Sequence, residues 1–451
     1  MKFYLSYCYF TPSMEKIQLC WLRRDLRLND HAALYHALKS GLKVQLLFIF
    51  DTNILKKLPI YDTRLDFIHL ALSQLNHELK AYNASLLVIH DTPIKAFEKC
   101  IAQFNIDTVF TNHDYEPYAQ QRDTEIKEFL QQHQIAFETY KDQVIFEKGE
   151  VLKDYGKPYT VFTPYSKKWK ALLNDFYYKP YPTEKYFHQF NTKSHPFSLP
   201  SLKDLGFEKT FIKFEKPVVN EAIITNYHLT RDIPSLAGTT KMSVHLRFGT
   251  LSIRKLAGIA FHTNEKYLNE LIWRDFYQSI LWHFPHVVNR AFKPAYDHIQ
   301  WQNNEMTFKA WCEGNTGYPI VDAGMRELNT TGWMHNRVRM IVASFLTKHL
   351  LIDWRWGEAY FAEKLIDYEL ASNNGGWQWA AGCGVDAAPY FRIFNPYLQT
   401  IKFDAKLDYI KKWVPEFESF TYPKPIVNHE MARKRCLETY KEALQANPFV
   451  E

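Results

Sequence analysis

The sequence predicts an α/β N-terminal domain with a doubly wound parallel sheet, followed by an all-α C-terminal domain. Short β-branched or apolar runs alternate with helical patterns up to about residue 140, and apolar residues recur at helical spacing after residue 200. A chain of 451 residues is also longer than one ordinary core supports. We therefore expect domains over residues 14–140 and 201–451, joined by a connector over residues 141–200.

In the first half, four apolar runs are expected to form parallel strands, with helices on both faces of the sheet. No GxGxxG motif follows the first run, so a dinucleotide is not expected at its usual place in such a fold. The expected strands are KIQLCWL, KVQLLFIF, ASLLVIH and IDTVFTN, and the expected helices span residues 31–40, 63–82 and 117–132.

Residues 141–200 are rich in glycine and proline and show little periodicity, which predicts a long connector and no third domain. Beyond residue 200 the chain is almost wholly helical in pattern. Asn-Asn-Gly-Gly at residues 373–376 is expected to break or cap the last of these helices, because Gly and Asn tolerate backbone angles that other residues avoid. The clearest helical spacing covers residues 265–284, 321–328, 333–350 and 358–370.

Composition limits the functional classes. The formal net charge is only +6, so binding of nucleic acid would have to come from a local patch. The six cysteines form no CxxC or Cys/His cluster, which predicts reduced thiols in a cytoplasmic protein and no metal site. No stretch approaches the ~20 apolar residues of a membrane helix. Residues 1–13 lack the features of a signal peptide, so they are either an added tail or a misassigned start before Met14.

The region 353–396 combines four tryptophans with a paired asparagine, two adjacent glycines and an Asp-Ala-Ala-Pro turn. This mixture suits a planar ligand that backbone can approach closely. A plain aromatic helical core with a glycine cap has the same composition.

Long motifs in the second half resemble the flavin-binding core of the DNA photolyase and cryptochrome family. They are GMRELNTTGWMHNRVRM at residues 324–340, DWRWGE, and NNGGWQWAAGCGVDAAPYFRIFNP. The similarity begins at WLRRDLRLNDHAAL and covers nearly the whole chain. It implies a light-driven, FAD-dependent enzyme that repairs pyrimidine dimers in damaged DNA, or a photoreceptor descended from one. We expect a cytoplasmic monomer that does not enter the membrane.

The resemblance also assigns the FAD site. Hydroxyls in GTTKMSVHLRFGTLS precede a helical run, where free N–H groups can hold a diphosphate, although a plain helix cap looks the same. Arg339 and Asp367 match a charged pair beside the flavin, and an ordinary salt bridge between helices is the alternative. Asn373 matches the residue that faces flavin N5, where plant cryptochromes carry aspartate and animal-type cryptochromes often cysteine. The candidate cofactor-binding residues are Tyr227, Thr239, Thr240, Lys241, Met242, Ser243, Arg274, Arg339, Asp367 and Asn373.

Trp377, Trp354 and Trp301 match an electron-hopping triad of the family, for which plain packing is the alternative. Glu270 and Trp273 lie three residues apart, on one helical face, and match the residues that bond to the base edges of the dimer and stack beneath it. The candidate catalytic residues are Glu270, Asn336, Trp301, Trp354 and Trp377. The candidate substrate-binding residues are Glu270, Trp273, Asn336, Arg337, Met340, Trp379 and Arg392, and Arg231 and Arg274 are further arginines that match positions near the lesion.

The type of lesion depends on Asn336. In (6-4) photolyases the segment that matches residues 335–336 supplies a pair of histidines, one of which is proposed to protonate the lesion. Asn336 cannot donate a proton in this way, so we expect repair of cyclobutane dimers, with a (6-4) photolyase and a cryptochrome-type photoreceptor as the alternatives. A sensory tail is hard to place after HEMARKRCLETY, which disfavours the photoreceptor.

An antenna chromophore of folate, deazaflavin or flavin type is implied between the two domains. Glu116 in NHDYE is a candidate contact for it, or a plain surface carboxylate. Cys383 and Val385 replace the small or hydroxyl residues expected from the resemblance, which leaves the fine tuning of the flavin pocket open.

Overall fold

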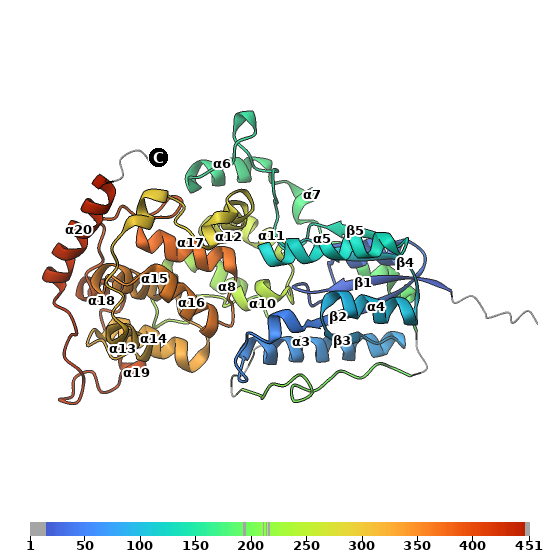
Figure 1. Ribbon diagram of the computed structural model, residues 1–451, viewed down its shortest axis with the longest axis horizontal. Helices are drawn as coiled ribbons and strands as arrows, with labels where there is room; N and C mark the ends of the chain where they lie inside the picture. Colours follow the sequence, from blue (N-terminus) through green and yellow to red (C-terminus); the bar gives the residue numbers. More distant parts are fainter. Residues whose placement is uncertain (1–14, 193–194, 211, 213, 215–216, 447–451) are drawn as a thin grey trace, which may run out of the picture.

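The computed structural model describes residues 15–192, 195–210, 212, 214 and 217–446. It confirms the predicted fold class: an α/β part lies beside a helical part, at the right and the left of Figure 1. Residues 1–13, the expected tail or misassigned start, lie outside the described residues. Among the described helices, none combines the length and the apolar character that crossing a membrane requires.

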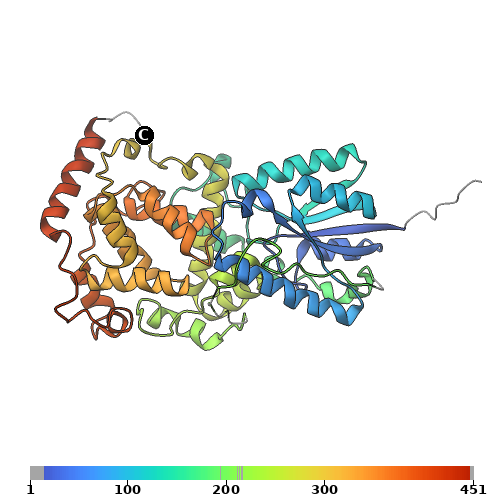
Figure 2. The same ribbon diagram turned by 60° about the horizontal axis from the view of Figure 1, so that its bottom comes forward.

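The sheet has five parallel strands in the order β3-β2-β1-β4-β5. Because successive side chains of a strand point to opposite faces, Leu19 and Trp21 of β1 pack with α4 and α5, whereas Cys20 and Leu22 pack with α1 and α3. Helices therefore cover both faces, as Figures 1 and 2 show. The elements are β1 (Lys16–Leu22), α1 (Ala32–Lys39), β2 (Lys43–Asp51), α2 (Thr52–Leu55), α3 (Thr63–Leu79), η1 (Lys80–Tyr82), β3 (Leu87–Asp91), α4 (Pro93–Gln103), β4 (Asn105–Asn112), α5 (Pro117–Gln132) and β5 (Ala136–Tyr140).

Strands β1 to β4 fall on the four predicted apolar runs, and α1, α3 and α5 fall on the three predicted helices. The sequence did not predict β5 or α4. β5 is an edge strand whose side chains are exposed or half-buried, so its sequence AFETY lacks the apolar run by which a buried strand is recognised.

The predicted connector is not structureless. It contains α6 (Phe162–Leu172), whose Tyr165 and Trp169 are buried in the core of the helical part. α6 therefore packs as part of the helical part, whereas Phe187 and Phe190 pack in the core of the α/β part. The boundaries at residues 140 and 200 stay predictions. The other short helices of this region are η2 (Asp154–Gly156), α7 (Asp175–Tyr178) and η3 (Thr183–Gln189).

From residue 217 to residue 446 the described chain contains helices and no strand, as predicted. The segment η6 is a single π-helical turn that directly follows α15. The helices are α8 (Glu221–Thr225), α9 (Tyr227–Thr230), α10 (Ser243–Phe248), α11 (Ile253–Thr263), α12 (Glu265–His283), η4 (Pro285–Val288), η5 (Pro294–His298), α13 (Glu305–Glu313), α14 (Pro319–Thr331), α15 (Asn336–Ser344), η6 (Phe345–His349), α16 (Trp354–Lys364), α17 (Leu370–Ala381), α18 (Pro396–Phe403), α19 (Asp408–Trp413) and α20 (His429–Ala446).

One prediction about these helices is wrong. Residues 358–370 were expected to form one helix that Asn-Asn-Gly-Gly ends, but α16 ends at Lys364 and a new helix, α17, runs through residues 373–376. Gly375 is needed here for packing and not for a turn, because a Cβ at this position would overlap the ring of Tyr277 on α12. Glycine lets α12 and α17 approach each other closely.

Buried ion pairs join the two parts of the molecule. Asp142, which follows β5, accepts from Arg27 of the α/β part and from Arg254 of α11, both at 2.6 Å. Arg254 also binds Asp30 at 2.8 Å. Burial by itself would raise the pKa of Asp142, but the two arginines outweigh it and hold the pKa well below its usual range.

We expect Asp142→Asn to lower the free energy of unfolding by about 3–5 kcal/mol, because two buried guanidinium groups lose their shared counter-charge. In the wild type this contribution is present above the ordinary carboxyl pKa of about 4 and is lost as the pH falls below it, since the folded-state pKa is depressed. Chemical denaturation over a pH series measures both effects. The matched control is Asp107→Asn, whose exposed pair with Lys16 contributes about 0–1 kcal/mol. Equal losses in the two variants would contradict the account.

Candidate cofactor and substrate cavity

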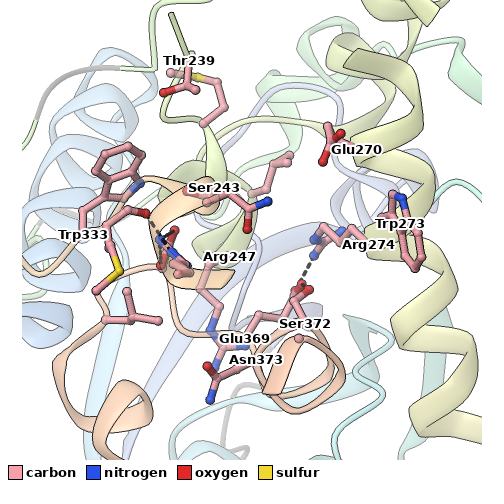
Figure 3. A pocket seen from close by; sticks show the side chains of 18 of the residues that line it. Thr239, Ser243, Arg247, Glu270, Trp273, Arg274, Trp333, Glu369, Ser372 and Asn373 are labelled. Carbon is pink, nitrogen blue, oxygen red and sulfur yellow. Dashed lines mark hydrogen bonds and ion pairs between the residues drawn. The ribbon is translucent and has the colours of Figure 1, made fainter. Parts of the chain in front are cut away.

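A cavity of about 500 Å³ opens among α12, α15, α17 and the segment before α10. Figure 3 shows side chains from these elements pointing into it from several sides. The described residues contain no group of three or more His, Cys, Asp or Glu side chains that could hold a metal ion. The cavity brings together these predicted residues: Tyr227, Arg231, Thr239, Thr240, Lys241, Met242, Ser243, Glu270, Trp273, Arg274, Asn336, Arg337, Arg339, Met340, Asp367, Asn373, Trp377 and Trp379.

Three predicted residues do not line the cavity. Trp354 is buried in the core beside it, and Trp301 lies in the segment before α13. Arg392 is exposed in the loop after α17, outside the cavity lining.

The segment of residues 239–243 forms one end of the cavity, at the N-terminus of α10. No side chain caps this helix, and the Thr240 hydroxyl instead pairs with the hydroxyl of Tyr267 at 2.7 Å. Lys241 has a left-handed backbone (φ 55°), which few non-glycine residues adopt. A left-handed residue before a helix start aims successive N–H groups outward, and such a concave arrangement binds anions.

Arg339 and Asp367 form the predicted pair, with a guanidinium nitrogen 2.9 Å from the carboxylate. Arg339 also donates to the carbonyl of Met334 at 2.8 Å, so both side chains are fixed. The pair is partly buried and lines the cavity, which places a positive group at its wall with a balancing negative one.

Asn373 lies on the cavity-facing side of α17, as Figure 3 shows. Its Nδ2 group donates to the carboxylate of Glu358 at 2.8 Å and to the Glu358 carbonyl at 3.1 Å. Both N–H bonds are therefore used, and no described residue donates to Oδ1. The side chain offers the cavity an acceptor.

Glu369, which directly precedes α17, was not predicted as a site residue. Its Oε1 accepts from Arg24 of the α/β part at 2.7 Å and from Arg274 of α12 at 2.6 Å, and its Oε2 accepts from Ser372 at 3.1 Å. Burial would raise the pKa of Glu369, but the neighbouring arginines lower it to about 2. Arg274, a candidate cofactor ligand, is thus already neutralised by the protein.

The candidate substrate residues begin at the same end of the cavity, because Glu270 lies one turn of α12 after Tyr267, the partner of the Thr240 hydroxyl. Glu270 accepts from Arg231 at 2.5 Å, and burial raises the pKa of Glu270 despite this partner. Trp273 stacks on Phe162 of α6, with ring centroids 3.7 Å apart and planes within 3°, so one face of its indole is covered. Asn336 begins α15 and lines the cavity, whereas His335 does not line it.

Two arginines at this end are held by one carboxylate. Arg337 binds Asp232 at 2.6 Å, and Arg231 approaches the same carboxylate at 3.9 Å. Arg337 also lies 4.5 Å over the ring of Phe403. The two guanidinium groups are therefore balanced by the two carboxylates, Asp232 and Glu270.

Trp377 lines the cavity, and with Trp354 it belongs to one buried core, against which Trp301 packs. The ring contacts of Trp377 are with Phe361, at 5.0 Å, and with Trp311, at 6.0 Å. Trp311 was not predicted to take part. The two helices that carry Trp354 and Trp377 can pack closely because Gly357 has no Cβ. A Cβ at this position would overlap the Trp377 ring.

Sequence reasoning missed several residues of the lining. Two of them, Arg247 and Glu369, are fixed by partners far along the chain, which no local sequence pattern reveals. Arg247 binds Glu116 at 2.8 Å, and Glu116 also binds Arg24 at 2.9 Å. The candidate antenna contact Glu116 thus holds the two parts of the molecule together. The main missed lining residues are Arg247, Tyr267, Tyr277, Trp333, Phe361, Tyr368, Glu369, Ser372 and Gly376.

Cys383 and Val385 are buried and do not line the cavity. Any influence of these two residues on a ligand there is indirect. Cys383 lies 3.7 Å from the carbonyl of Gln378, which supports the end of α17.

A second cavity, of about 240 Å³, lies within the α/β part near the carboxyl ends of β2 and β3. This edge is where ligands bind in open parallel sheets. One wall includes Tyr118, whose hydroxyl donates to Asp51 just after β2, and Arg122, which lies 4.9 Å over the Trp21 ring. The cavity is lined by Asn53, Thr92, Pro93, Ile94, Tyr118, Gln121, Arg122, Glu125 and Ile126.

Comparison with known families covers both parts of the chain. Residues 18–185 match the family described as DNA photolyase, and residues 267–421 match the FAD binding domain of DNA photolyase. The chain is 36% identical to the deoxyribodipyrimidine photo-lyase of Vibrio cholerae, over 95% of this chain and 100% of that protein.

Two solved structures are similar over almost the full length. One is a bacterial class III photolyase from Agrobacterium tumefaciens, with a TM-score of 0.85 and 31% identity over 97% of this chain and 100% of that one. The other is an archaeal photolyase from Sulfolobus tokodaii with two FAD molecules, described as implying a novel light-harvesting cofactor. Its TM-score is 0.78, with 33% identity over 95% of this chain and 100% of that one.

The adjacent glycines of α17 give a direct test of the cavity. We expect Gly375→Ala to destabilise the fold by about 1–3 kcal/mol, because the new methyl group overlaps Tyr277. Gly376 lines the cavity and has no atom near its missing Cβ. Gly376→Ala should therefore keep or raise the stability, by up to about 1 kcal/mol, yet lower the FAD content because the methyl group enters the cavity. Thermal unfolding and the flavin-to-protein absorbance ratio measure the two effects. Full FAD content in Gly376→Ala would show that the ligand does not reach this helix.

Proposed function

This chain belongs to the DNA photolyase family, and we propose that it is a deoxyribodipyrimidine photolyase that splits cyclobutane pyrimidine dimers in damaged DNA under light. The observation that carries the proposal is the single cavity that holds both the predicted flavin-binding residues and the predicted lesion-binding residues. When bound, reduced FAD supplies the electron that opens the dimer after absorbing light. The protein residues bind and orient FAD and the lesion, and they exclude water from the cavity.

The cavity fits FAD on several counts. The left-handed Lys241 and the uncapped start of α10 provide N–H groups for a diphosphate. Gly376 leaves one wall open to a planar ring. Trp377 adds an aromatic ring to the wall.

Three side chains are proposed to tune the bound flavin. Arg339 would stabilise negative charge on the ring, and Asp367 keeps the guanidinium in place at 2.9 Å. Asn373 is proposed to accept a hydrogen bond from flavin N5 through Oδ1, because Glu358 already accepts both of its N–H groups. An acceptor suits the reduced state, in which N5 carries a hydrogen. This arrangement supports repair over a cryptochrome-type photoreceptor, for which an aspartate or cysteine was expected at this position.

The lesion must leave the DNA stack to reach the cavity, which is easiest where its pairing is already weakened. We propose that Trp273 presents its uncovered face to the dimer, because Phe162 covers the other face. Glu270 and Asn336 would bond to the base edges, while Met340 and Trp379 line the pocket. Arg231 and Arg337 would then exchange their carboxylate partners for the flanking phosphates. We propose that Arg392, which is exposed outside the cavity, contacts a DNA phosphate farther from the lesion.

The choice of cyclobutane dimers over (6-4) photoproducts rests on Asn336 and is supported by its neighbour. His335 is buried, and its Nδ1 accepts from the backbone N–H of Arg337 as the cap of α15. Burial and nearby arginines lower the pKa of His335 to about 4, so the imidazole stays neutral near pH 7. Neither residue is therefore a proton donor to a (6-4) lesion.

We also propose a cytoplasmic monomer. The described cysteines are all free thiols, which is the usual state in a reducing compartment. For the antenna chromophore, whose identity is open, the cavity of about 240 Å³ at the edge of the sheet is a better candidate than the surroundings of Glu116.

We propose that Trp377, Trp354 and Trp301 carry electrons to oxidised FAD. Trp301→Phe should cut the rate of flavin photoreduction to a small fraction of the wild-type rate, because phenylalanine is far harder to oxidise. Repair by prereduced protein should stay close to the wild type. Trp282→Phe, a change of another half-buried tryptophan, is the matched control. Unchanged photoreduction in the Trp301 variant would remove this residue from the route.

Glu270→Ala tests the lesion site. Loss of a charged hydrogen-bond acceptor should weaken lesion binding by about 1.5–3 kcal/mol, or about tenfold to a hundredfold, without release of FAD. Glu265→Ala, an exposed position on the same helix, is the control. The assay illuminates prereduced protein with oligonucleotides that carry either lesion and follows repair by chromatography. Efficient repair of the (6-4) lesion, or no repair of the cyclobutane one, would overturn the proposed function.

A further inference from the structure

Lys348 is a buried lysine without a carboxylate partner. It lies in the π-helical turn η6, with only 1% of its surface exposed. Its Nζ donates to the carbonyl of Ala381 at 2.8 Å and sits 3.8 Å from the ring centroid of Tyr440. Lys348 forms no ion pair with a carboxylate among the described residues, and the groups that act on its charge are the thiols of Cys436 and Cys383. π-Helical turns are uncommon and often occur at functional sites.

Tyr440 lies between this lysine and the proposed electron route. It is fully buried on α20, the helix at the far left of Figure 1. Its ring meets that of Trp301 edge-on, with centroids 5.9 Å apart and planes at 90°. Its hydroxyl donates to the carbonyl of Ala381 at 3.0 Å, the same oxygen that Lys348 binds. A tyrosine beside an oxidised tryptophan can reduce it only if the phenol can lose its proton.

We propose that Lys348 determines whether Tyr440 reduces oxidised Trp301, a proposal that rests on the proposed electron route through Trp301. When Nζ is an ammonium group, its charge over the ring opposes removal of an electron from Tyr440. The ammonium cannot accept a proton, and the Ala381 carbonyl is no base. Oxidised Trp301 then stays oxidised until the electron returns from the flavin or a reductant arrives from solution.

When Nζ is a neutral amine, it can accept the proton of Tyr440 while Trp301 accepts the electron, because Tyr440 contacts both residues. The electron moves from Tyr440 to the Trp301 radical cation, which becomes neutral tryptophan. The hydroxyl proton of Tyr440 leaves its bond to the Ala381 carbonyl and moves to Nζ of Lys348, which bonds to the same oxygen. The products are a neutral tyrosyl radical and a lysine ammonium group, so the total charge of the three residues is unchanged and no further reactant is needed.

The surroundings favour titration of Lys348 close to neutral pH. Burial lowers the pKa of Lys348 to about 8. Burial also raises the pKa of two nearby thiols, to about 12 for Cys383 and about 11 for Cys436, so both stay protonated and do not compete as bases. The other titratable or charged groups around Tyr440 and these thiols come from several elements. They are Tyr296 and Asp297 on η5, Asp353 just before α16, Arg355 on α16, Tyr390 in the loop after α17, and Arg435 on α20.

The test is a pH series of flash photolysis on the whole protein with oxidised FAD, with tyrosyl and tryptophanyl radicals distinguished by absorption and electron paramagnetic resonance. Because the neutral fraction of Lys348 grows with pH, the tyrosyl yield should rise about tenfold between about pH 7 and pH 9. Tyr440→Phe should remove the tyrosyl signal and leave a long-lived Trp301 radical at every pH.

Lys348→Arg is the second variant, because arginine stays charged throughout this range. It should keep the tyrosyl radical absent at high pH. If this variant does not fold, the wild-type series and Tyr440→Phe still decide the question. A tyrosyl yield in the wild type that is independent of pH, or no tyrosyl radical at any pH while the tryptophan radical forms, would overturn the role of Lys348. Absence of any tryptophan radical would instead contradict the proposed route itself.

Discussion

The carboxylate of Glu369 is the contact on which the rest of the site depends. It is buried where the α/β part, α12 and α17 meet, and it accepts from Arg24 and Arg274 at 2.7 and 2.6 Å. A buried carboxylate is costly unless it is paired and fully hydrogen-bonded. The two arginines come from segments far apart in the chain, so this pairing forms only when both parts of the molecule are folded and in contact.

The position of Glu369 explains why that contact matters for function. It directly precedes α17, the helix that carries Ser372, Asn373, Gly376 and Trp377 into the cavity. Fixing the start of a helix fixes the direction of every side chain on it. The α/β part thus contributes to the flavin cavity through Arg24 without lining the cavity itself. At the other end of α17, the Ala381 carbonyl is held by Lys348 and Tyr440, so both ends of this helix have buried polar anchors.

The sequence predicted the fold class and most of the residues that meet in the cavity. Buried strands such as β2, KVQLLFIFD, are recognisable because most of their residues are apolar, whereas the edge strand β5, AFETY, carries no such run. The Asn-Asn-Gly-Gly break was wrong because the local preference of glycine is overridden by close packing against Tyr277. Glu369 and Arg247 could not be predicted, since their role comes from partners that local sequence does not reveal. The roles of the predicted residues at the bound flavin and at the lesion stay proposals.

The most direct test of this account is the stoichiometry of FAD in purified Glu369→Gln protein, read from its absorption spectrum beside the wild type. The exposed Glu363→Gln, on the preceding helix, is the matched control. We expect about one FAD per chain in the wild type and in the control, and a marked loss in Glu369→Gln because two buried arginines lose their counter-charge and the start of α17 shifts. Full retention of FAD in Glu369→Gln would contradict the claim that this carboxylate holds the cavity together.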